Sequence, residues 1–516
     1  MKKHIRLTAL LLSLITLLMT AVSCAETAEE AETTAATVET NASASGVDST
    51  EAETTAEETL FAPDNLKEKY DFNETITIFM WDDYRMTEFY ADETGDIIDD
   101  SIYHRNVKVS ERLGITLEFV EEPGDSGDYK AWIQKAENDW QSDNTYDIYA
   151  GYSRSAPLMT LKGMTVNLLD YEAFSVEKPW WPQALTTECT INDKLYFCSG
   201  DISTNLLWMM IGTFYNKDLY EQYFGGEKSP MDMVEDNEWT MEKFFSMAQD
   251  IYLDDGNGKK DDADTYGFVL YQTNADAFQT GAGIISIEKD PAKGLRISEG
   301  WNSQRSADAC ALLGAFLDSE GVFYNDSTKI RDIFYEERAL FITDRLFIVA
   351  GKDTQETGKI EFSYGLVPQP KFSTDQEIFL TNVGHPFTMY AVNSQSKKLE
   401  ASVTSLEAIG SANHRSVTPA VFEVAMKVRY TDDPQTSSMY DTLREGISFD
   451  IGRLYASTFQ NGTANLFRTT ALSGNPSGLL SNIKKNLSAK VDIANRVQKF
   501  VDCRSRDVNV RELYIV

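Results

Sequence analysis

The feature that most constrains the fold is an alternation of strand-like and helix-like segments between residues 75 and 152. Segments 75–81, 115–120 and 146–152 are rich in β-branched and aromatic residues, which predicts strands. Strands that alternate with helices form a parallel sheet through right-handed crossovers, so an α/β fold is expected. The intervening apolar stripes at helical spacing are Ile98, Ile102, Val109 and Leu113, then Tyr129, Trp132, Ile133, Ala136 and Trp140.

The ends of two of these predicted strands indicate where a ligand binds. Ligands of open parallel sheets bind beyond the carboxyl ends of the strands. The residues at the ends of the first and third strands, or just after them, are Trp81, Asp82, Asp83, Tyr152, Ser153 and Arg154.

The length and charge of the chain limit its organisation and partners. From Leu60 onward there are roughly 450 residues, more than one core of ~100–200 residues holds, so at least two lobes are expected. The formal net charge is −34, from 47 Lys and Arg against 81 Asp and Glu. This balance argues against nucleic acid or an anionic lipid surface as a partner of the folded body.

The N-terminus has the pattern of a secretory signal. Lys2, Lys3 and Arg6 precede an apolar stretch, 7–21, that is short for a bilayer span of ~20 residues. The sequence Ala-Val-Ser-Cys at 21–24 resembles the lipobox of bacterial lipoproteins, although Ala21 departs from the commoner Leu. The resemblance implies a signal peptide over 1–23 and a lipidated, palmitate-bearing Cys24, whose several acyl chains give stable attachment. An ordinary signal peptide or an uncleaved anchor are the alternatives.

A polar acidic segment follows this cysteine. Between Ala25 and Thr59 there is no Lys or Arg, almost no large apolar residue, and ten acidic residues. Such a segment cannot bury enough apolar surface to offset its ordering entropy, and its like charges extend it. We therefore expect residues 24–60 to form a disordered tether.

Two of the five cysteines bracket a predicted hairpin. Cys189 and Cys198 flank "TINDKLYF", which predicts a turn at Asn192 and Asp193. A turn centred there pairs Cys189 with Tyr196, one place away from Cys198. A disulfide and two free thiols both remain open, and no cysteine spacing indicates a zinc site.

Seven segments, taken in order, resemble one protein family across residues 66–510. The family is the extracellular solute-binding lipoproteins of bacterial ABC importers (family 1), in the branch dominated by carbohydrate binders. The segments are "ITIFMWDD", "YDIYAGYSR", "INDKLYFCSGD", "GTFYNKDLYEQY", "WTMEKFFSMAQDI", "RALFITDRLFIVA" and "FSYGLVPQPKF".

The resemblance implies a two-lobed periplasmic-binding-protein-like fold of the sugar-binding type II cluster. A hinge joins the lobes, and the ligand is held in the cleft between them. The chain is expected to cross between lobes near Asp201 to Asn205 and to return near Val367 to Pro370. The N-terminal lobe then comprises 66–203 with 368–415, and the C-terminal lobe 206–366 with 416–510.

The resemblance also implies a set of residues in the cleft. Sugar recognition uses aromatic faces to stack on pyranose rings, and carboxylates, amides or Arg to bond the hydroxyls. Trp208 is equally compatible with the core, Trp180 and Trp181 favour packing, and Arg154 could equally be a surface charge. The matched positions are Trp81, Asp82, Asp83, Tyr152, Arg154, Asp201, Trp208, Arg345, Phe347, Gly384 and His385.

The segment "LDDGNGKKDDAD", 253–264, approximates an EF-hand calcium loop. With Gly258 at place 6, the ligands at places 3, 5, 7, 9 and 12 are Asp255, Asn257, the Lys259 carbonyl, Asp261 and Asp264. Place 1 is Leu253, which has no side-chain oxygen, although Asp254 lies beside it. A structural Ca²⁺ and a solvated acidic turn are the two interpretations.

The expected function is that of a monomeric binding protein with no catalytic residues and no required cofactor. It would capture a carbohydrate, an oligosaccharide by preference, at the extracellular face of the cell membrane and deliver it to the permease subunits of an ABC importer. The alternatives are a secreted glycoside-active enzyme, which needs only two carboxylates, and a lipoprotein that binds peptides or other solutes. None of the four histidines, His4, His104, His385 and His414, lies in a zinc-protease or nucleophile-elbow motif.

Overall fold

The structure is a computed structural model that describes residues 62–82, 87–290, 294–350, 360–459, 461–483 and 485. The predicted signal peptide, the lipidation site at Cys24 and the tether therefore lie outside the described residues, as does Asp83. The chain divides into two units, residues 1–60 and 61–516, and the description below concerns the second unit.

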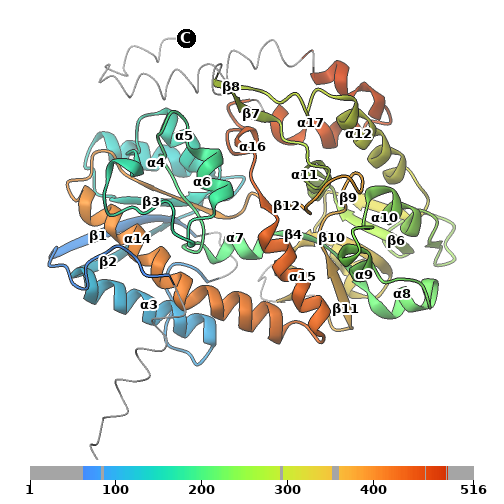
Figure 1. The fold of residues 1–516 in the computed structure, drawn as a ribbon, viewed down its shortest axis with the longest axis horizontal. Coiled ribbons are helices and arrows are strands. Elements are labelled where there is room, and N and C mark those ends of the chain that lie inside the picture. The colour runs from blue at the N-terminus through green and yellow to red at the C-terminus, as the bar shows by residue number, and fades with distance from the viewer. Residues whose placement is uncertain are drawn as a thin grey trace, which may run out of the picture. The chain divides into compact units, whose positions relative to one another are not determined.

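The first sheet has four strands in the order β13-β3-β1-β2 (Figure 1). They are β1 (Glu74–Trp81), β2 (Ile115–Glu122), β3 (Ile148–Tyr152) and β13 (Thr388–Val392). β1 pairs in parallel with both β2 and β3, which confirms the parallel arrangement predicted from residues 75–152. β13 comes from more than 200 residues further along the chain and pairs antiparallel with β3 at the edge of the sheet.

Helices cover both faces of this sheet (Figure 1). They are α3 (Ile97–Leu113), α4 (Tyr129–Gln141), α5 (Ser155–Leu161) and α14 (Leu399–Arg415). The Asp96 side chain accepts a hydrogen bond from the Ile98 N–H at the start of α3, and Gly114 ends that helix in the left-handed conformation with φ 65°. The predicted apolar stripes of α3 and α4 are buried in the core, with Trp140 only partly buried.

The second sheet has six strands: β4 (Ile211–Asn216), β5 (Tyr252–Leu253), β6 (Thr265–Tyr271), β9 (Val322–Asn325), β10 (Ala339–Arg345) and β11 (Tyr364–Val367). β6 pairs in parallel with β9 and β10, whereas β4 runs antiparallel to β10 and β11. A cluster of phenylalanines fills its core, in which the rings of Phe245 and Phe316 stack with centroids 4.0 Å apart. Its helices include α8 (Lys217–Phe224), α9 (Pro230–Glu235), α10 (Met241–Ala248) and α12 (Gln304–Leu317).

A run of late helices contacts both sheets. It comprises α14, the π-helix η4 (Pro419–Arg429) and α15 (Pro434–Glu445). α14 packs against α3, β1 and β13, whereas α15 packs against β11 and α9. The predicted lobe ranges, 66–203 with 368–415 and 206–366 with 416–510, are compatible with this arrangement and stay a prediction.

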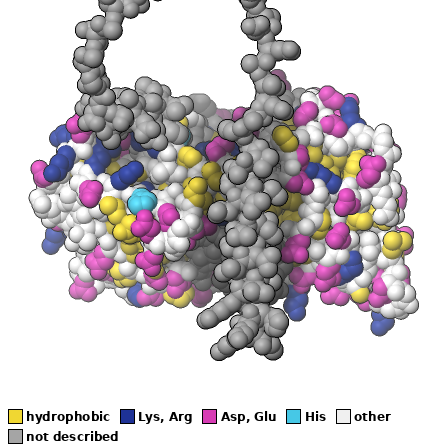
Figure 2. Space-filling model, turned by 90° about the horizontal axis from the view of Figure 1, so that it is seen from below, with side chains coloured by type: hydrophobic (Ala, Val, Ile, Leu, Met, Phe, Trp, Pro, Cys, Tyr) yellow, Lys and Arg dark blue, Asp and Glu magenta, His cyan; other side chains and the backbone are white. Residues whose placement is uncertain are grey.

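The remaining elements are short. Within the described residues, no helix combines the length and apolar character that crossing a bilayer requires. Acidic and basic side chains are interspersed over the uncovered part of the face in Figure 2. The short elements are α6 (Gln183–Cys189), α7 (Thr204–Trp208), α11 (Asp276–Gly281), α13 (Ile330–Tyr335), α16 (Ile451–Leu454), α17 (Gly462–Ala471), β7 (Ile287–Asp290), β8 (Gly294–Ile297), β12 (Thr381–Asn382), β14 (Ile447–Ser448) and the 3-10 turns η1 (Leu168–Asp170), η2 (Gln272–Ala275), η3 (Leu346–Val349) and η5 (Pro476–Gly478).

The predicted hairpin at 189–198 is smaller than expected. The turn lies at Asn192 and Asp193, both with positive φ, but it closes a single bridge between Ile191 and Lys194. Cys189 ends α6 rather than belonging to a strand, and Cys198 forms a bridge with Tyr390 of β13. Both cysteines are buried free thiols, so the disulfide alternative does not hold in the structure.

Candidate ligand-binding site

One cavity of about 460 Å³ lies among residues from both sheets. This volume is within the ~300–1,000 Å³ typical of ligand pockets. Four strands contribute their last residue to its wall: Trp81 from β1, Tyr152 from β3, Tyr271 from β6 and Arg345 from β10. The cavity therefore lies at the carboxyl ends of parallel strands in both sheets, where the sequence pattern predicts a ligand site.

Six of the residues expected in the cleft line this cavity: Trp81, Tyr152, Arg154, Arg345, Phe347 and His385, with Gly384 beside them. Asp82 is exposed outside the cavity, where its N–H donates to the Glu122 carbonyl at 3.1 Å. Binding of a ligand by these residues stays a prediction.

Asp201 lies outside the cavity, between two late helices. Its carboxylate accepts from His414 Nδ1 of α14 at 2.6 Å and from Arg444 Nη2 of α15 at 3.2 Å. Its carbonyl accepts from Asn413 Nδ2 at 2.7 Å. These contacts join Asp201 to both helices. Asp201 therefore has a structural role at the predicted crossing between the lobes.

Trp208 lies in the core rather than in the cavity wall. It is 1% exposed, and its ring makes an edge contact with Tyr430 at 6.1 Å. Trp180 and Trp181 are fully buried, as the packing interpretation predicts. Of the tryptophans predicted for the cleft, only Trp81 lines the cavity.

The aromatic residues of the cavity are held by neighbouring groups. Trp81 donates from Nε1 to Thr388 Oγ1 at 3.0 Å, and its ring meets Tyr152 edge-on at 5.8 Å. The guanidinium carbons of Arg331 and Arg345 lie 4.8 and 5.1 Å from the centroid of the Phe347 ring. Phe347 thus supports arginines through cation–π contacts, a role different from the expected stacking on sugar.

Charged residues that the sequence interpretation missed complete the wall. Arg453 of α16 and Arg468 of α17 both pair with the Asp276 carboxylate, at 3.2 and 3.0 Å. All three line the cavity. The strand-end rule could have identified Tyr271, which closes the strand "TYGFVLY", but no local pattern marks the two arginines.

His385 is neutral in the cavity. Its burial, together with the charges of Arg154, Arg453 and Arg468, holds the pKa of the imidazole well below its usual range. Arg154 donates from Nη2 to His385 Nε2 at 2.9 Å, so Nε2 is the acceptor and the ring proton lies on Nδ1. His385 therefore adds no charge of its own at neutral pH.

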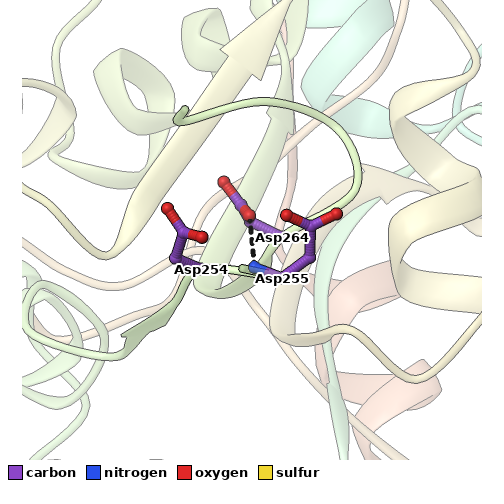
Figure 3. Close-up of side chains that lie close together, drawn as sticks. All are labelled: Asp254, Asp255 and Asp264. Carbon is purple, nitrogen blue, oxygen red and sulfur yellow. Dashed lines mark hydrogen bonds between the residues drawn. The ribbon is translucent and has the colours of Figure 1, made fainter. Parts of the chain in front are cut away.

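The acidic loop 253–264 brings three carboxylates together (Figure 3). Asp254, Asp255 and Asp264 each offer an oxygen within 4.8 Å of the others. Asp264 is buried and accepts from the N–H groups of Asp255 and Asp261 and from the hydroxyls of Tyr252 and Tyr266. Asn257 and Asp261, two of the other expected ligands, are hydrogen-bonded to each other at 3.2 Å, and Lys259 is exposed.

Comparisons with known proteins define the fold. No family model matches the sequence, and no curated protein matches it. Among solved structures, the chain is similar to a cyclo/maltodextrin-binding protein complexed with maltotetraose (13% identity, TM-score 0.52, 82% of this chain and 98% of that chain). It is also similar to a cyclic alpha-maltosyl-1,6-maltose binding protein from Arthrobacter globiformis (14%, 0.51, 82% and 99%).

A third similar structure is the maltose-binding periplasmic protein of Listeria monocytogenes in complex with maltose (14% identity, TM-score 0.50, 81% of this chain and 98% of that chain). Sequence identities this low show likeness of fold. The described body therefore has the two-lobed periplasmic-binding-protein-like fold.

Proposed function

We propose that this chain is the substrate-binding protein of a bacterial ABC importer and captures an oligosaccharide between its lobes. The observation that carries the proposal is the cavity lined by strand ends of both sheets, Trp81 and Tyr152 from one and Tyr271 and Arg345 from the other. A ligand that contacts both sheets binds a closed form better than an open one and shifts the population toward closure. The similar structures that hold maltose and maltotetraose support a sugar as the ligand.

The test is a thermal-shift screen of the full-length protein in mild detergent against neutral and acidic oligosaccharides and short peptides. A ligand at 100 times its Kd adds ~2.7 kcal/mol to the free energy of unfolding, which raises the Tm. We expect one sugar class to raise the Tm and to be recovered chemically unchanged. Stabilisation by peptides alone would contradict the carbohydrate assignment.

A transport role is favoured over a glycosidase. Catalysis of glycoside cleavage needs a proton-donating carboxylic acid opposite a second carboxylate. Two described aspartates line the cavity, Asp125 and Asp276, and the Asp276 carboxylate is held by two guanidinium groups. Hydrolysis of a bound sugar, detected by mass spectrometry, would overturn the transport assignment.

Membrane attachment through Cys24 is part of the same proposal. The mature protein would be held at the extracellular face by lipid and a tether over 24–60, and it would dock as a monomer on permease subunits. A Cys24→Ser variant should lose incorporation of labelled palmitate and leave the membrane fraction. Equal palmitate labelling of the variant and the natural protein would contradict this assignment.

A structural Ca²⁺ in the loop 253–264 is also proposed. Asp254, Asp255 and Asp264 supply oxygen ligands, which Ca²⁺ prefers, and Asp254 takes the place of Leu253 as a carboxylate at the start of the loop. The ion would hold the loop between β5 and β6, and no residue of that loop lines the cavity.

A further inference from the structure

A late segment from Ile447 to Phe459, called the strap below, lies between elements of different sheets. It contains β14 and α16; β14 contacts α6, and α16 contacts β7 (Figure 1). α6 leads to Cys198, which bridges Tyr390 of the first sheet, whereas β7 follows α11, which packs against α12 of the second sheet. Below, the first half means the first sheet with α4 and α6, and the second half means the second sheet with α11, α12 and β7.

The strap is fixed to the second half by buried contacts. The Asp450 carboxylate accepts from the N–H and from the hydroxyl of Ser286, just before β7, both at 2.6 Å. Arg453 pairs with Asp276 of α11 at 3.2 Å. At Gly452 an added Cβ would clash with the Ser286 hydroxyl, so the strap backbone lies directly against the start of β7. We therefore group the strap with the second half.

Two further hydrogen bonds join the strap to the first half. The Ile451 N–H at the start of α16 donates to Glu188 Oε1 of α6 at 3.1 Å. The Tyr129 hydroxyl of α4 is hydrogen-bonded to the Ser457 hydroxyl, and the two oxygens are 2.9 Å apart. Both hydrogen bonds would break if the two halves separated.

A lysine of the second half also reaches α6 directly. Lys289 of β7 donates from Nζ to three backbone carbonyls of the first half. They belong to Thr187, to Glu188 at 3.2 Å and to Thr190 at 3.2 Å. These carbonyls lie at the C-terminal end of α6, where backbone C=O groups lack intrahelical partners and the helix dipole favours a cation. The three donors of the ammonium group are thus matched by three acceptors of the first half.

The contacts between the halves differ from those that hold the strap on the second half. The hydrogen bonds of Asp450 are buried, whereas those of Glu188, Lys289 and the Tyr129–Ser457 pair are only partly buried. Water replaces a partly buried hydrogen bond at a small net cost, so these bonds break and form while each half stays folded. None of these four residues lines the cavity, and both partners in every contact are protein groups.

We propose that Lys289, Glu188 and the Tyr129–Ser457 pair form a latch that holds the two halves together without help from a ligand. The ligand-free protein then populates the closed arrangement to a measurable extent. The latch does not depend on the proposed function, whereas its effect on ligand affinity rests on that function. A ligand that binds only the closed arrangement has an apparent Kd equal to its intrinsic Kd divided by the closed fraction, so the latch tightens binding without touching the ligand.

The test is the distance between spin labels at the exposed positions Gln134 of α4 and Asp308 of α12, attached through non-natural amino acids, in the ligand-free full-length protein in mild detergent. We expect a short and a long population in the natural protein. The ratio of short to long should fall several-fold in Lys289→Met, which keeps most of the aliphatic stem and removes the charge. Tyr129→Phe, which removes only the hydroxyl, should lower the ratio as well. The matched control is Lys397→Met, an exposed lysine before α14, which should leave the distribution unchanged.

Two results of the distance measurement would overturn the latch. One is an identical distribution in the natural protein, Lys289→Met and Tyr129→Phe. The other is a natural protein that shows only the long distance without ligand.

Binding separates the latch from the proposed function. It is measured by calorimetry with maltotetraose and with the sugar that gives the largest Tm shift in the thermal-shift screen. The Kd should rise several-fold in Lys289→Met and stay unchanged in Lys397→Met. An unchanged Kd in Lys289→Met despite shifted distances would disprove the coupling to binding. If the distances respond but no sugar binds to the natural protein, the carbohydrate part of the proposed function fails while the latch stands.

Discussion

Glu407 lies in α14, one of the helices that cover the first sheet, and its carboxyl group is buried. It is 0% exposed, Trp181 Nε1 donates to its Oε2 at 2.9 Å, and the Ser175 N–H donates to the same oxygen at 3.3 Å. Burial raises the pKa of the carboxyl to about 7, and these hydrogen bonds only partly oppose the shift. The folded state thus keeps a proton that the unfolded chain releases above its ordinary pKa of 4.5.

This difference predicts a pH dependence of stability. The contribution of Glu407 is full below about pH 4.5 and is lost as pH rises through 7, because the unfolded state binds fewer protons over that range. The loss is about 3 kcal/mol. Urea unfolding at pH 5 and pH 8 should show that Glu407→Gln loses less stability than the natural protein. The exposed Glu400→Gln of the same helix is the control, and an equal pH response of all three proteins would contradict the assignment.

Gly384 makes room for Arg345 in the cavity. An added Cβ would lie 2.9 and 3.3 Å from the arginine Cδ and Cγ, so Gly384→Ala should displace that side chain. We expect at least a several-fold rise in Kd for the captured ligand by calorimetry, with little change in Tm. Gly300→Ala, in an exposed turn where the Cβ meets only Ser298 Oγ at 3.3 Å, is the control. Equal Kd values for the two variants would show that Arg345 does not contact the ligand.

The residues that line the cavity differ in whether a local sequence pattern could predict their position. Trp81 and Tyr152 end predicted strands and Arg154 lies just after one, so the strand-end rule places them in the wall without a structure. Arg453 and Arg468 come from short helices near the C-terminus, whose position depends on tertiary packing that sequence patterns do not reveal. Asp201 and Trp208 lie at or near the predicted crossing between the lobes. The local sequence there does not distinguish a cleft residue from a buried one.

At the level of elements, local sequence periodicity predicts individual strands and helices, but it does not predict which distant strands pair. The three strands and two helices between residues 74 and 152 were predictable because their apolar patterns lie within each segment. The edge position of β13 depends on pairing across more than 200 residues, which no local pattern carries. The hairpin predicted at 189–198 is longer than the one in the structure, because Cys198 pairs with Tyr390 of β13 and not with a residue of the same hairpin.

The loop 253–264 allows a direct test of calcium binding. The Asp264 carboxylate accepts four hydrogen bonds, from the N–H groups of Asp255 and Asp261 and from the hydroxyls of Tyr252 and Tyr266. A bound ion would therefore share this carboxylate with those donors or displace them. At 100 times its Kd, Ca²⁺ would add ~2.7 kcal/mol to stability. We expect Ca²⁺ to raise the Tm of the natural protein and not that of Asp255→Asn, with ligand affinity unchanged. The absence of a binding heat and of a Tm change would favour the solvated acidic turn.

At the scale of the whole molecule, the account depends on one ligand that contacts residues of both sheets. Tyr152 ends β3 of the first sheet and Arg154 follows it at the start of α5, whereas Arg345 ends β10 of the second sheet and Asp276 starts α11. In the proposed function, a bound ligand therefore favours a closed arrangement. The late helices α14 to α15 contact both sheets.

The most direct measurement of this claim is the distance between two spin labels, attached through non-natural amino acids at exposed positions Gln134 of α4 and Asp308 of α12. The account predicts that a saturating oligosaccharide shortens this distance in the natural protein and leaves it unchanged in Arg154→Gln at the same ligand concentration. An identical distance distribution with and without saturating ligand in the natural protein would contradict capture by closure.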